Sequence, residues 1–188
     1  RPDGSGSTEI YGNQIALPPV LIHGRAVPGT NHRFVATATM HHPFAVGPIM
    51  LLDTSRNIRS HEPLQSITPE TSLSIEGVGS FPNGENFTHL KNGRWVADNV
   101  GPLYSEPYPL GDPQTGAGAG KYFLVDCNPD KAWNDASAYG LYLIDSFGNQ
   151  AEIFSDPKIS CWQPIPMAAR TVPPIVSSNE PVDSVGPN

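Results

Sequence analysis

The stretch HGRAVPGTNHRFVATATMHHPFAVGPIMLLD, residues His23 to Asp53, decides the fold. It contains two short apolar runs, Phe34–Met40 and Ile49–Asp53, which are rich in branched residues and bounded by glycine or proline. Runs of this kind predict β-strands. A polar segment that ends at Val27-Pro28-Gly29 precedes the first run, and we call such a segment the opening of a repeat.

The same order of segments returns later in the chain. Residues 104–149 contain SEPYPLG, KYFLVDC and GLYLIDSFGN in turn, and a third opening, SCWQPIP, begins at Ser160. Pro28, Pro109 and Pro166 hold matching places in the three openings. Intervals of roughly 55 to 80 residues suit a four-stranded propeller blade with a long inserted loop. The repeat therefore predicts β-propeller blades.

The composition agrees with a fold built from strands and long loops. The 188 residues include 21 prolines and 18 glycines, and only 15% are charged. Proline and glycine interrupt nearly every window in which a helical period could develop. We therefore expect an all-β chain: a partial β-propeller of about three blades over residues 1–170, then a Pro- and Ser-rich extended tail or linker over 171–188.

Two loops between the blades carry turn signals. Asn92-Gly93 predicts a hairpin turn before a short strand at Trp95–Ala97. The segment DPQTGAGAG, residues 112–120, predicts a flexible surface loop.

The charge of the chain argues against nucleic acid as a partner. The formal net charge is −7, and the 11 basic residues are scattered singly, whereas phosphate binding needs clustered Lys and Arg.

No stretch approaches the roughly 20 apolar residues that span a bilayer, so we expect no transmembrane segment. The first residues lack the apolar centre of a signal peptide, and a start within a Pro-Asp-Gly turn predicts a processed product or a piece of a longer chain.

The two cysteines, Cys127 and Cys161, allow one disulfide at most. The alternative is a pair of buried free thiols. A turn-rich, charge-poor, all-β chain is typical of the periplasm or the cell exterior, and we expect one of these locations.

Five phrases in order resemble the propeller domain of the hydrazine synthase alpha-subunit family. They are RAVPGTNHRFVATATMHH, GPIMLLD, LYSEPYPLG, YGLYLIDSFGN and ISCWQPIPM, and they cover most of residues 22–174. Members of this family are large secreted bacterial proteins within the wider TolB-like and WD40-like propeller group, and they typically carry c-type cytochrome domains beside the propeller.

The resemblance implies a place in a multi-haem complex. In hydrazine synthase, the complex condenses nitric oxide and ammonium-derived nitrogen into hydrazine on haem. This sequence contains no Cys-x-x-Cys-His, so no c-type haem can be attached to it. We therefore expect neighbouring haem c on other segments or chains, and a structural, partner-binding role for this chain in a cytochrome-containing complex.

The adjacent histidines His41 and His42 are the predicted cofactor-binding residues. They stand at the predicted end of a strand, where propeller loops converge, and adjacent strand residues face opposite sides. A haem-pocket or metal role would use a neutral imidazole nitrogen. The resemblance implies a haem near such histidines. The alternative is a hydrogen-bonded structural pair.

Asp126, Asn128 and Asp130 have the alternating oxygen spacing of a calcium loop. Lys131 replaces the usual glycine at the sixth position. Calcium or zinc is the predicted metal, and an Asx-rich turn between strands is the alternative.

Five aromatic and charged residues at equivalent positions in the openings are predicted to line one rim of the propeller and bind a partner: His23, Arg25, Tyr104, Glu106 and Tyr108. The alternative is that the tyrosines pack between blades.

Three hypotheses for function follow. The first is the structural portion of a haem complex, and the second is an extracellular propeller that binds peptide or glycan through its aromatic rim. The third, a hydrolase propeller, is disfavoured because no Gly-x-Ser-x-Gly motif occurs.

Overall fold

The computed structural model describes residues 7–12, 14, 18, 20–39, 43–71, 73–75, 79–81, 88–92, 94–97, 102–112, 114–167 and 172. This part of the chain contains β-strands and connections without a helix, so the all-β prediction is confirmed. Its strands are β1 (Val20–Ala26), β2 (Arg33–Thr39), β3 (Ile49–Asp53), β4 (Leu64–Ser66), β5 (Leu73–Ile75), β6 (Gly79–Phe81), β7 (Thr88–Lys91), β8 (Arg94–Ala97), β9 (Leu103–Pro109), β10 (Tyr122–Asn128), β11 (Gly140–Asp145) and β12 (Gln150–Phe154).

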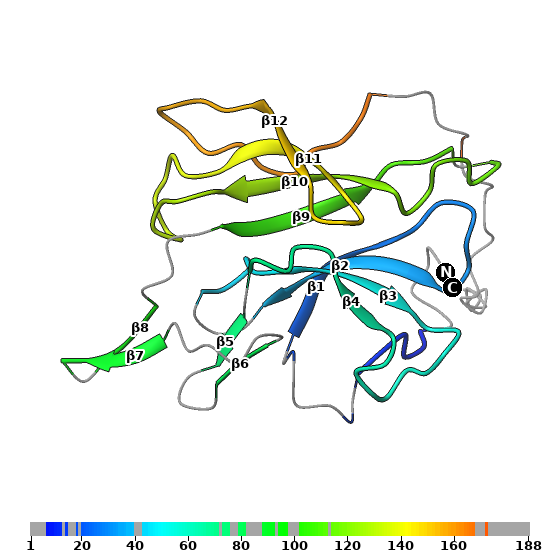
Figure 1. Cartoon of the computed structure of the whole chain (residues 1–188), viewed down its shortest axis with the longest axis horizontal. Coiled ribbons are helices and arrows are strands. Elements are labelled where there is room, and N and C mark those ends of the chain that lie inside the picture. The colour runs from blue at the N-terminus through cyan, green and yellow to red at the C-terminus, as the bar shows by residue number, and fades with distance from the viewer. Residues whose placement is uncertain are drawn as a thin grey trace, which may run out of the picture.

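The strands form two four-stranded antiparallel sheets that lie one above the other (Figure 1). The first sheet has the order β1-β2-β3-β4 and the second the order β12-β11-β10-β9, so each is a meander of consecutive strands. Strands β5 and β6 pair with each other, as do β7 and β8. The two large sheets do not close into a ring.

The apolar runs of the sequence became strands where they were predicted. The run Phe34–Met40 corresponds to β2, and Ile49–Asp53 is β3. The β7–β8 hairpin turns at Asn92, whose φ of 52° is the left-handed conformation that the Asn-Gly signal predicts. In the segment predicted as a flexible loop, the described residues 112 and 114–120 form turns: backbone N–H groups bond to carbonyls within them, and the Asp112 carboxylate accepts from the Gln114 and Thr115 N–H groups.

The two sheets share one register. Arg33 pairs with Asp53 in the first sheet, and Tyr122 pairs with Asp145 in the second. When Arg33 is aligned with Tyr122, and Asp53 with Asp145, each residue of β2 matches one of β10 and each residue of β3 matches one of β11. We call this alignment the shared register. The sequence repeat is thus a repeat of strand pairing.

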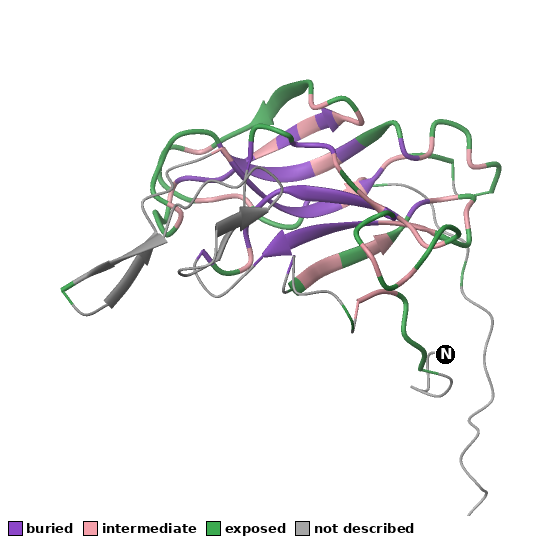
Figure 2. Ribbon diagram, turned by 60° about the horizontal axis from the view of Figure 1, so that its bottom comes forward, coloured by how far each residue is buried: buried purple, intermediate pink, exposed green. Residues whose placement is uncertain are grey.

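The main apolar core lies between the sheets (Figure 2). The first sheet contributes Val35, Ile49 and Leu51, and the second contributes Phe123 and several neighbours on β10 and β11, namely Val125, Cys127, Tyr142 and Ile144. Each fully buried aliphatic or aromatic side chain of this kind stabilises the fold by roughly 1.5–3 kcal/mol. Burial of the core therefore holds the two repeats together.

Backbone contacts join the sheets at both ends of the interface. At one end Tyr104 N–H donates to Gly47 O at 3.1 Å, and Gly47 N–H donates to Tyr104 O at 2.9 Å. At the other end Gly29 and Gly116, from the β1–β2 and β9–β10 connections, lie so close that a Cβ on Gly29 would stand 2.5 Å from Gly116 Cα. The relative position of the sheets is therefore fixed by backbone as well as by side chains.

In the described part of the chain, no helix is long and apolar enough to cross a membrane. The predicted tail, residues 171–188, lies outside the described residues apart from Val172.

Candidate functional site

Left-handed backbone conformations gather at one place between the sheets. Among the described residues, five that are not glycine have positive φ, and four of them meet here: His23 (55°), Ala45 (67°), Glu106 (47°) and Gln163 (57°). A bulky residue in this region of φ costs about 1–3 kcal/mol and persists only where the surrounding structure imposes it. This clustering marks the junction as the candidate functional site.

Two β-bulges bring the polar side chains to the junction. The register of β1 against β2 shifts between Ile22 and Arg25, which leaves His23 in the bulge. The register of β9 against β10 shifts next to Ser105, which leaves Glu106 in a bulge of its own. Bulges re-aim side chains near functional sites, and these two direct His23 and Glu106 toward each other across the sheets.

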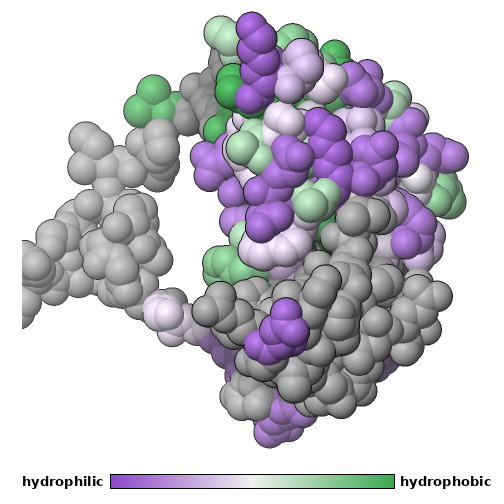
Figure 3. Space-filling model, turned by 90° about the vertical axis from the view of Figure 1, so that its left-hand side faces the viewer, coloured by the Kyte–Doolittle hydropathy of each residue, from purple (hydrophilic) through white to green (hydrophobic). Residues whose placement is uncertain are grey.

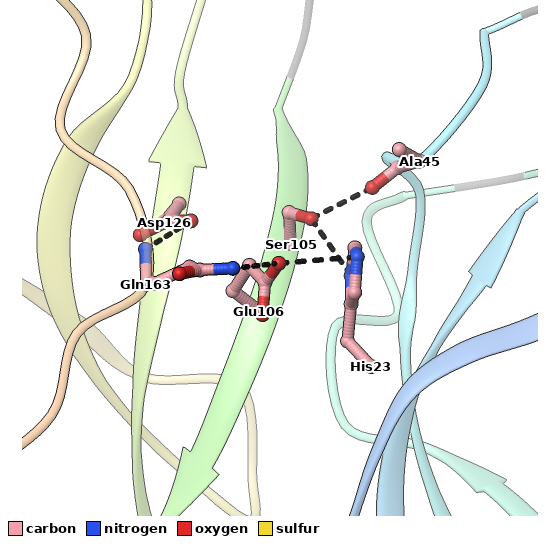
Figure 4. Close-up of polar contacts among 6 residues, drawn as sticks. All are labelled: His23, Ala45, Ser105, Glu106, Asp126 and Gln163. Carbon is pink, nitrogen blue, oxygen red and sulfur yellow. Dashed lines mark hydrogen bonds and ion pairs between the residues drawn. The ribbon is translucent and has the colours of Figure 1, made fainter.

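The junction is a connected polar network (Figure 4). His23 Nε2 lies 3.1 Å from Glu106 Oε1, and His23 Nδ1 lies 3.3 Å from Ser105 Oγ. The Ser105 hydroxyl donates to Ala45 O at 2.7 Å. Gln163 Nε2 donates to Glu106 Oε1 at 3.2 Å. The network thus links β1, the β2–β3 connection, β9 and the segment after β12.

His23 is the neutral donor of this network. Burial lowers its pKa most; Glu106 opposes this by raising the pKa, and Arg25 lowers it again. A neutral imidazole carries one N–H. Because the carboxylate of Glu106 is an acceptor, that hydrogen lies on Nε2. Nδ1 then carries no hydrogen, and its 3.3 Å approach to Ser105 Oγ is a polar contact rather than a hydrogen bond, because the Ser105 hydroxyl donates to Ala45 O.

We expect the pKa of His23 to respond in opposite directions to two substitutions. Glu106→Gln should lower it further, because the charge that raises it is lost, and Arg25→Met should raise it. Titration of the His23 ring signals by NMR measures both shifts, with His32, whose side chain is 48% exposed, as the internal reference. Movement in the same direction in both variants would contradict this electrostatic account.

Asp126 is a fully buried carboxyl on β10 at the back of the network. Gln163 N–H donates to its Oδ2 at 3.2 Å, whereas its Oδ1 has no partner among the described residues. Burial raises the pKa of Asp126 to about 8; the Gln163 N–H lowers it, and the nearby Glu106 raises it. The group therefore holds its proton at neutral pH.

Arg25 and Tyr108 form the second contact between β1 and β9. The guanidinium lies over the Tyr108 ring, with 5.1 Å between Arg25 Cζ and the ring centroid. Both residues line a shallow groove of about 360 Å³ between the two first strands. A cation–π pair of this geometry contributes about 0.5–1 kcal/mol at an exposed site.

The order Ser105, His23, Glu106 resembles the serine–base–acid connectivity of a hydrolase. Two observations argue against that use. Ser105 is fully buried, so no substrate reaches its hydroxyl, and its hydrogen is directed to Ala45 O rather than to the imidazole. The network is therefore better suited to hold the strands in position than to perform acyl transfer.

Four of the five predicted partner-binding residues meet in two contacts, His23 with Glu106 and Arg25 with Tyr108. Tyr104 differs, because it is fully buried in the core and its hydroxyl donates to Glu70. Burial and this bond raise its pKa. Tyr104 therefore packs in the core, and its partner-binding role stays a prediction.

The predicted calcium residues lie at the end of β10 but do not converge on one point. Asn128 is buried and closes the following turn: its Oδ1 accepts from Lys131 N–H at 2.8 Å, and its Nδ2 donates to Lys131 O and Ala132 O. Asp130 is exposed. In the described part of the chain, no group of three or more His, Cys, Asp or Glu is placed to hold a metal ion. The geometry is that of an Asx turn, and the calcium or zinc site stays a prediction.

Removal of the Asn128 amide should destabilise the protein. Asn128→Ala leaves the Lys131 N–H and two carbonyl groups without their partner, so we expect a loss of about 2–3 kcal/mol in the free energy of unfolding. Asn134→Ala, on the exposed part of the same connection, should change it by less than about 0.5 kcal/mol. Urea unfolding measures both, and equal losses would show that the Asn128 bonds contribute nothing specific.

The predicted cofactor residues His41 and His42 lie outside the described residues, so their haem or metal role stays a prediction. The structure resumes at Pro43, whose carbonyl accepts a bond from Thr39 Oγ1 at 3.2 Å. The β2–β3 connection that contains them continues into Ala45, an acceptor of the polar network.

Both cysteines are free thiols; Cys127 is buried and Cys161 partly buried. Near Cys161 the Trp162 ring stacks on Tyr139 at a centroid distance of 4.6 Å. An open groove of about 550 Å³ runs beside this pair, between the β2–β3 and β10–β11 connections, and Phe44 and Trp133 also line it. At this end of the molecule, apolar residues are interspersed with hydrophilic ones (Figure 3).

The sequence did not single out Ser105 or Gln163, and it assigned Asp126 to a metal. A signal for Gln163 was present: it stands three residues before Pro166, as Glu106 stands three residues before Pro109. Ser105 carried no such signal, because its role depends on a contact with Ala45, a residue distant in the sequence.

In comparisons with known proteins, no family model, no curated protein and no solved structure matches the chain.

Proposed function

We propose that this chain is a β-propeller segment that serves as a structural and partner-binding portion of a larger periplasmic complex. The observation that carries the propeller interpretation is the third opening. Cys161 N–H donates to Tyr139 O at 2.8 Å, and Tyr104 N–H donates to Gly47 O at 3.1 Å. In the shared register these two bonds are equivalent.

Backbone conformation supports the same equivalence. Gln163 and Glu106 stand at matching positions before their prolines, and both are left-handed, with φ of 57° and 47°. In this proposal β1, β9 and the segment from Ser160 onward are successive inner strands. The His23–Glu106–Gln163 network joins these inner strands as they follow one another.

The multi-haem part of the proposal is supported by the resemblance to the hydrazine synthase alpha-subunit family. The junction itself does not fit a haem ligand set, because both His23 ring nitrogens already face Glu106 and Ser105. Any haem, and any redox chemistry, is therefore assigned to other segments or chains. The chain's own contribution is a largely buried polar junction that holds the inner strands in position, beside the Arg25–Tyr108 groove.

The visible absorption spectrum of the native assembly that contains this chain tests this proposal. A Soret band that co-purifies with the chain is the expected result, and Glu106→Lys should weaken retention of the haem-bearing partner, because it places a cation at the junction. A colourless assembly would overturn the haem interpretation.

A second candidate is an extracellular module that binds peptide or glycan. The Phe44–Trp133 groove beside the Tyr139–Trp162 stack favours it, because exposed aromatic rings anchor ligands of both kinds. Binding of an oligosaccharide or peptide array to the colourless chain, with loss on Trp162→Ala, would support this candidate over the first.

A further inference from the structure

The second sheet presents an apolar face on the side away from the first sheet. Leu124, Leu141 and Leu143 point to this outer face, opposite the core side of β10 and β11, and all three are only partly buried. At its edges Tyr122 is 50% exposed and Phe154 is 54% exposed. Partly exposed leucines flanked by exposed aromatic residues mark an interaction surface; on the same face of β10, Asp126 is already buried.

The matching face of the first sheet is already covered. In the shared register Leu124, Leu141 and Leu143 correspond to Val35, Ile49 and Leu51. Those three residues are 0%, 0% and 5% exposed, because the second sheet packs on them. The outer face therefore has the pattern of an inter-sheet interface but lacks the sheet.

The first strand of the missing sheet is in place. The segment Ser160–Met167 runs beside the second sheet and bonds to Tyr139 O and to Asp126, as β9 bonds to Gly47. Three of its apolar side chains are exposed: Trp162 at 48%, Ile165 at 52% and Met167 at 104%. Side chains of an inner strand are exposed in this way when the other strands of its sheet are not paired with it.

The first sheet of a second copy of this chain could not cover this face. The outer side of that sheet is closed, since Ala38, Met50 and Leu52 are 0%, 1% and 4% exposed. The occupant must instead pair with Ser160–Met167 and cover Leu143.

We propose that the outer face of the second sheet binds a further four-stranded antiparallel sheet of the same repeat, whose first strand is Ser160–Met167. This inference rests on the propeller arrangement of the proposed function and adds which surface binds and what kind of partner it takes. The interface would repeat the packing of the first sheet on the second, with alternating apolar residues on the incoming strands.

Tandem duplication of residues 110–166 tests the proposal. The duplicated chain keeps every natural residue and supplies, after the first Pro166, a copy of the strands that follow Pro109. Because stability in repeat proteins grows with each packed neighbour, we expect Tm to rise by roughly 5 °C or more. The added segment should also resist trypsin.

Leu143 supplies a matched pair of variants in the duplicated chain. Leu143→Asp in the first copy lies under the added sheet and should cancel the rise in Tm and expose the added segment to trypsin. The same substitution in the second copy lies on the new outer face, and should change Tm only as much as it does in the natural chain. Limited proteolysis reads out folding of the added segment even where Tm is hard to define.

Three outcomes would overturn the proposal: no rise in Tm, rapid cleavage of the added segment, or equal effects of Leu143→Asp in both copies. A natural chain that sediments as a dimer, and as a monomer with Leu143→Asp, would also overturn it, since a second copy would then be the occupant. None of these outcomes depends on haem, so this test and the absorption test of the proposed function fail separately.

Discussion

Asp126→Asn should make the protein more stable at pH 9 than the unsubstituted chain and remove most of its loss of stability between pH 5 and 8. The reason is the buried carboxyl, whose pKa burial raises to about 8. An Asp in an unfolded chain has a pKa of about 3.9. Asparagine keeps the acceptor for Gln163 N–H without a group that ionises.

The sign follows from proton counting. Between about pH 4 and pH 8, the folded state holds a proton that the unfolded state has released. Stability therefore falls as pH rises through this window, by up to about 1.4 kcal/mol per pH unit, and levels off above the folded pKa. Over this whole window, Asp126 lowers the stability of the fold by on the order of 5 kcal/mol. Asp126→Asn removes this loss, but the new side-chain amide is unpaired and costs about 1–3 kcal/mol, so the net gain at pH 9 is smaller by that amount.

Asp145→Asn is the matched control. Asp145 is partly exposed at the β11–β12 turn, and its pKa is lowered, most strongly by the Asn149 side chain and also by the Phe147 and Asn149 N–H groups. Its stabilising contribution is lost as pH falls through the acid range, so this variant should keep the slope between pH 5 and 8. Chemical unfolding at a series of pH values measures both. Parallel curves for Asp126→Asn and the unsubstituted chain would show that Asp126 is already ionised in the fold.

The sequence predicted the two central strands of each sheet because their residues are largely apolar on both faces. Nearly every side chain in β2 and β3 is buried, and the second sheet covers their core side. Strands that are buried on both faces appear in the sequence as short, continuous apolar runs. Strand β1 was harder to predict: its residues are mostly half-exposed and its bulge breaks the alternation. The polar segment His23–Gly29 was therefore predicted to be a connection, whereas its first part belongs to strand β1.

The candidate site could be predicted only in part. The matching prolines placed Arg25 and Glu106 at equivalent positions. The pairing of His23 with Glu106, however, follows from two bulges whose left-handed residues are not glycine. Tertiary packing imposes those conformations against local preference, and no local pattern in the sequence encodes them. The role of Asp126 was missed for a related reason, because burial by the segment after β12 is a long-range effect.

Gly29→Ala should be among the most damaging single substitutions of a surface residue in this chain. The φ of Gly29 is +71°, and a Cβ there would lie 2.5 Å from Gly116 Cα, a backbone atom of the facing loop. A side chain at positive φ costs about 1–2 kcal/mol, and forcing two packed backbones apart costs about 1–3 kcal/mol more. We expect a total loss of roughly 2–5 kcal/mol in the free energy of unfolding.

Gly118→Ala separates the two causes. Gly118 has nearly the same φ, +76°, but a Cβ there meets nothing within 4 Å. This variant should lose only the conformational cost of about 1–2 kcal/mol. The difference between the two variants, measured by urea unfolding, is the contribution of the contact that holds the β1–β2 connection against the β9–β10 connection. If Gly29→Ala and Gly118→Ala lose equal stability, the two loops do not touch in solution, and the contact between them does not help to hold the sheets together.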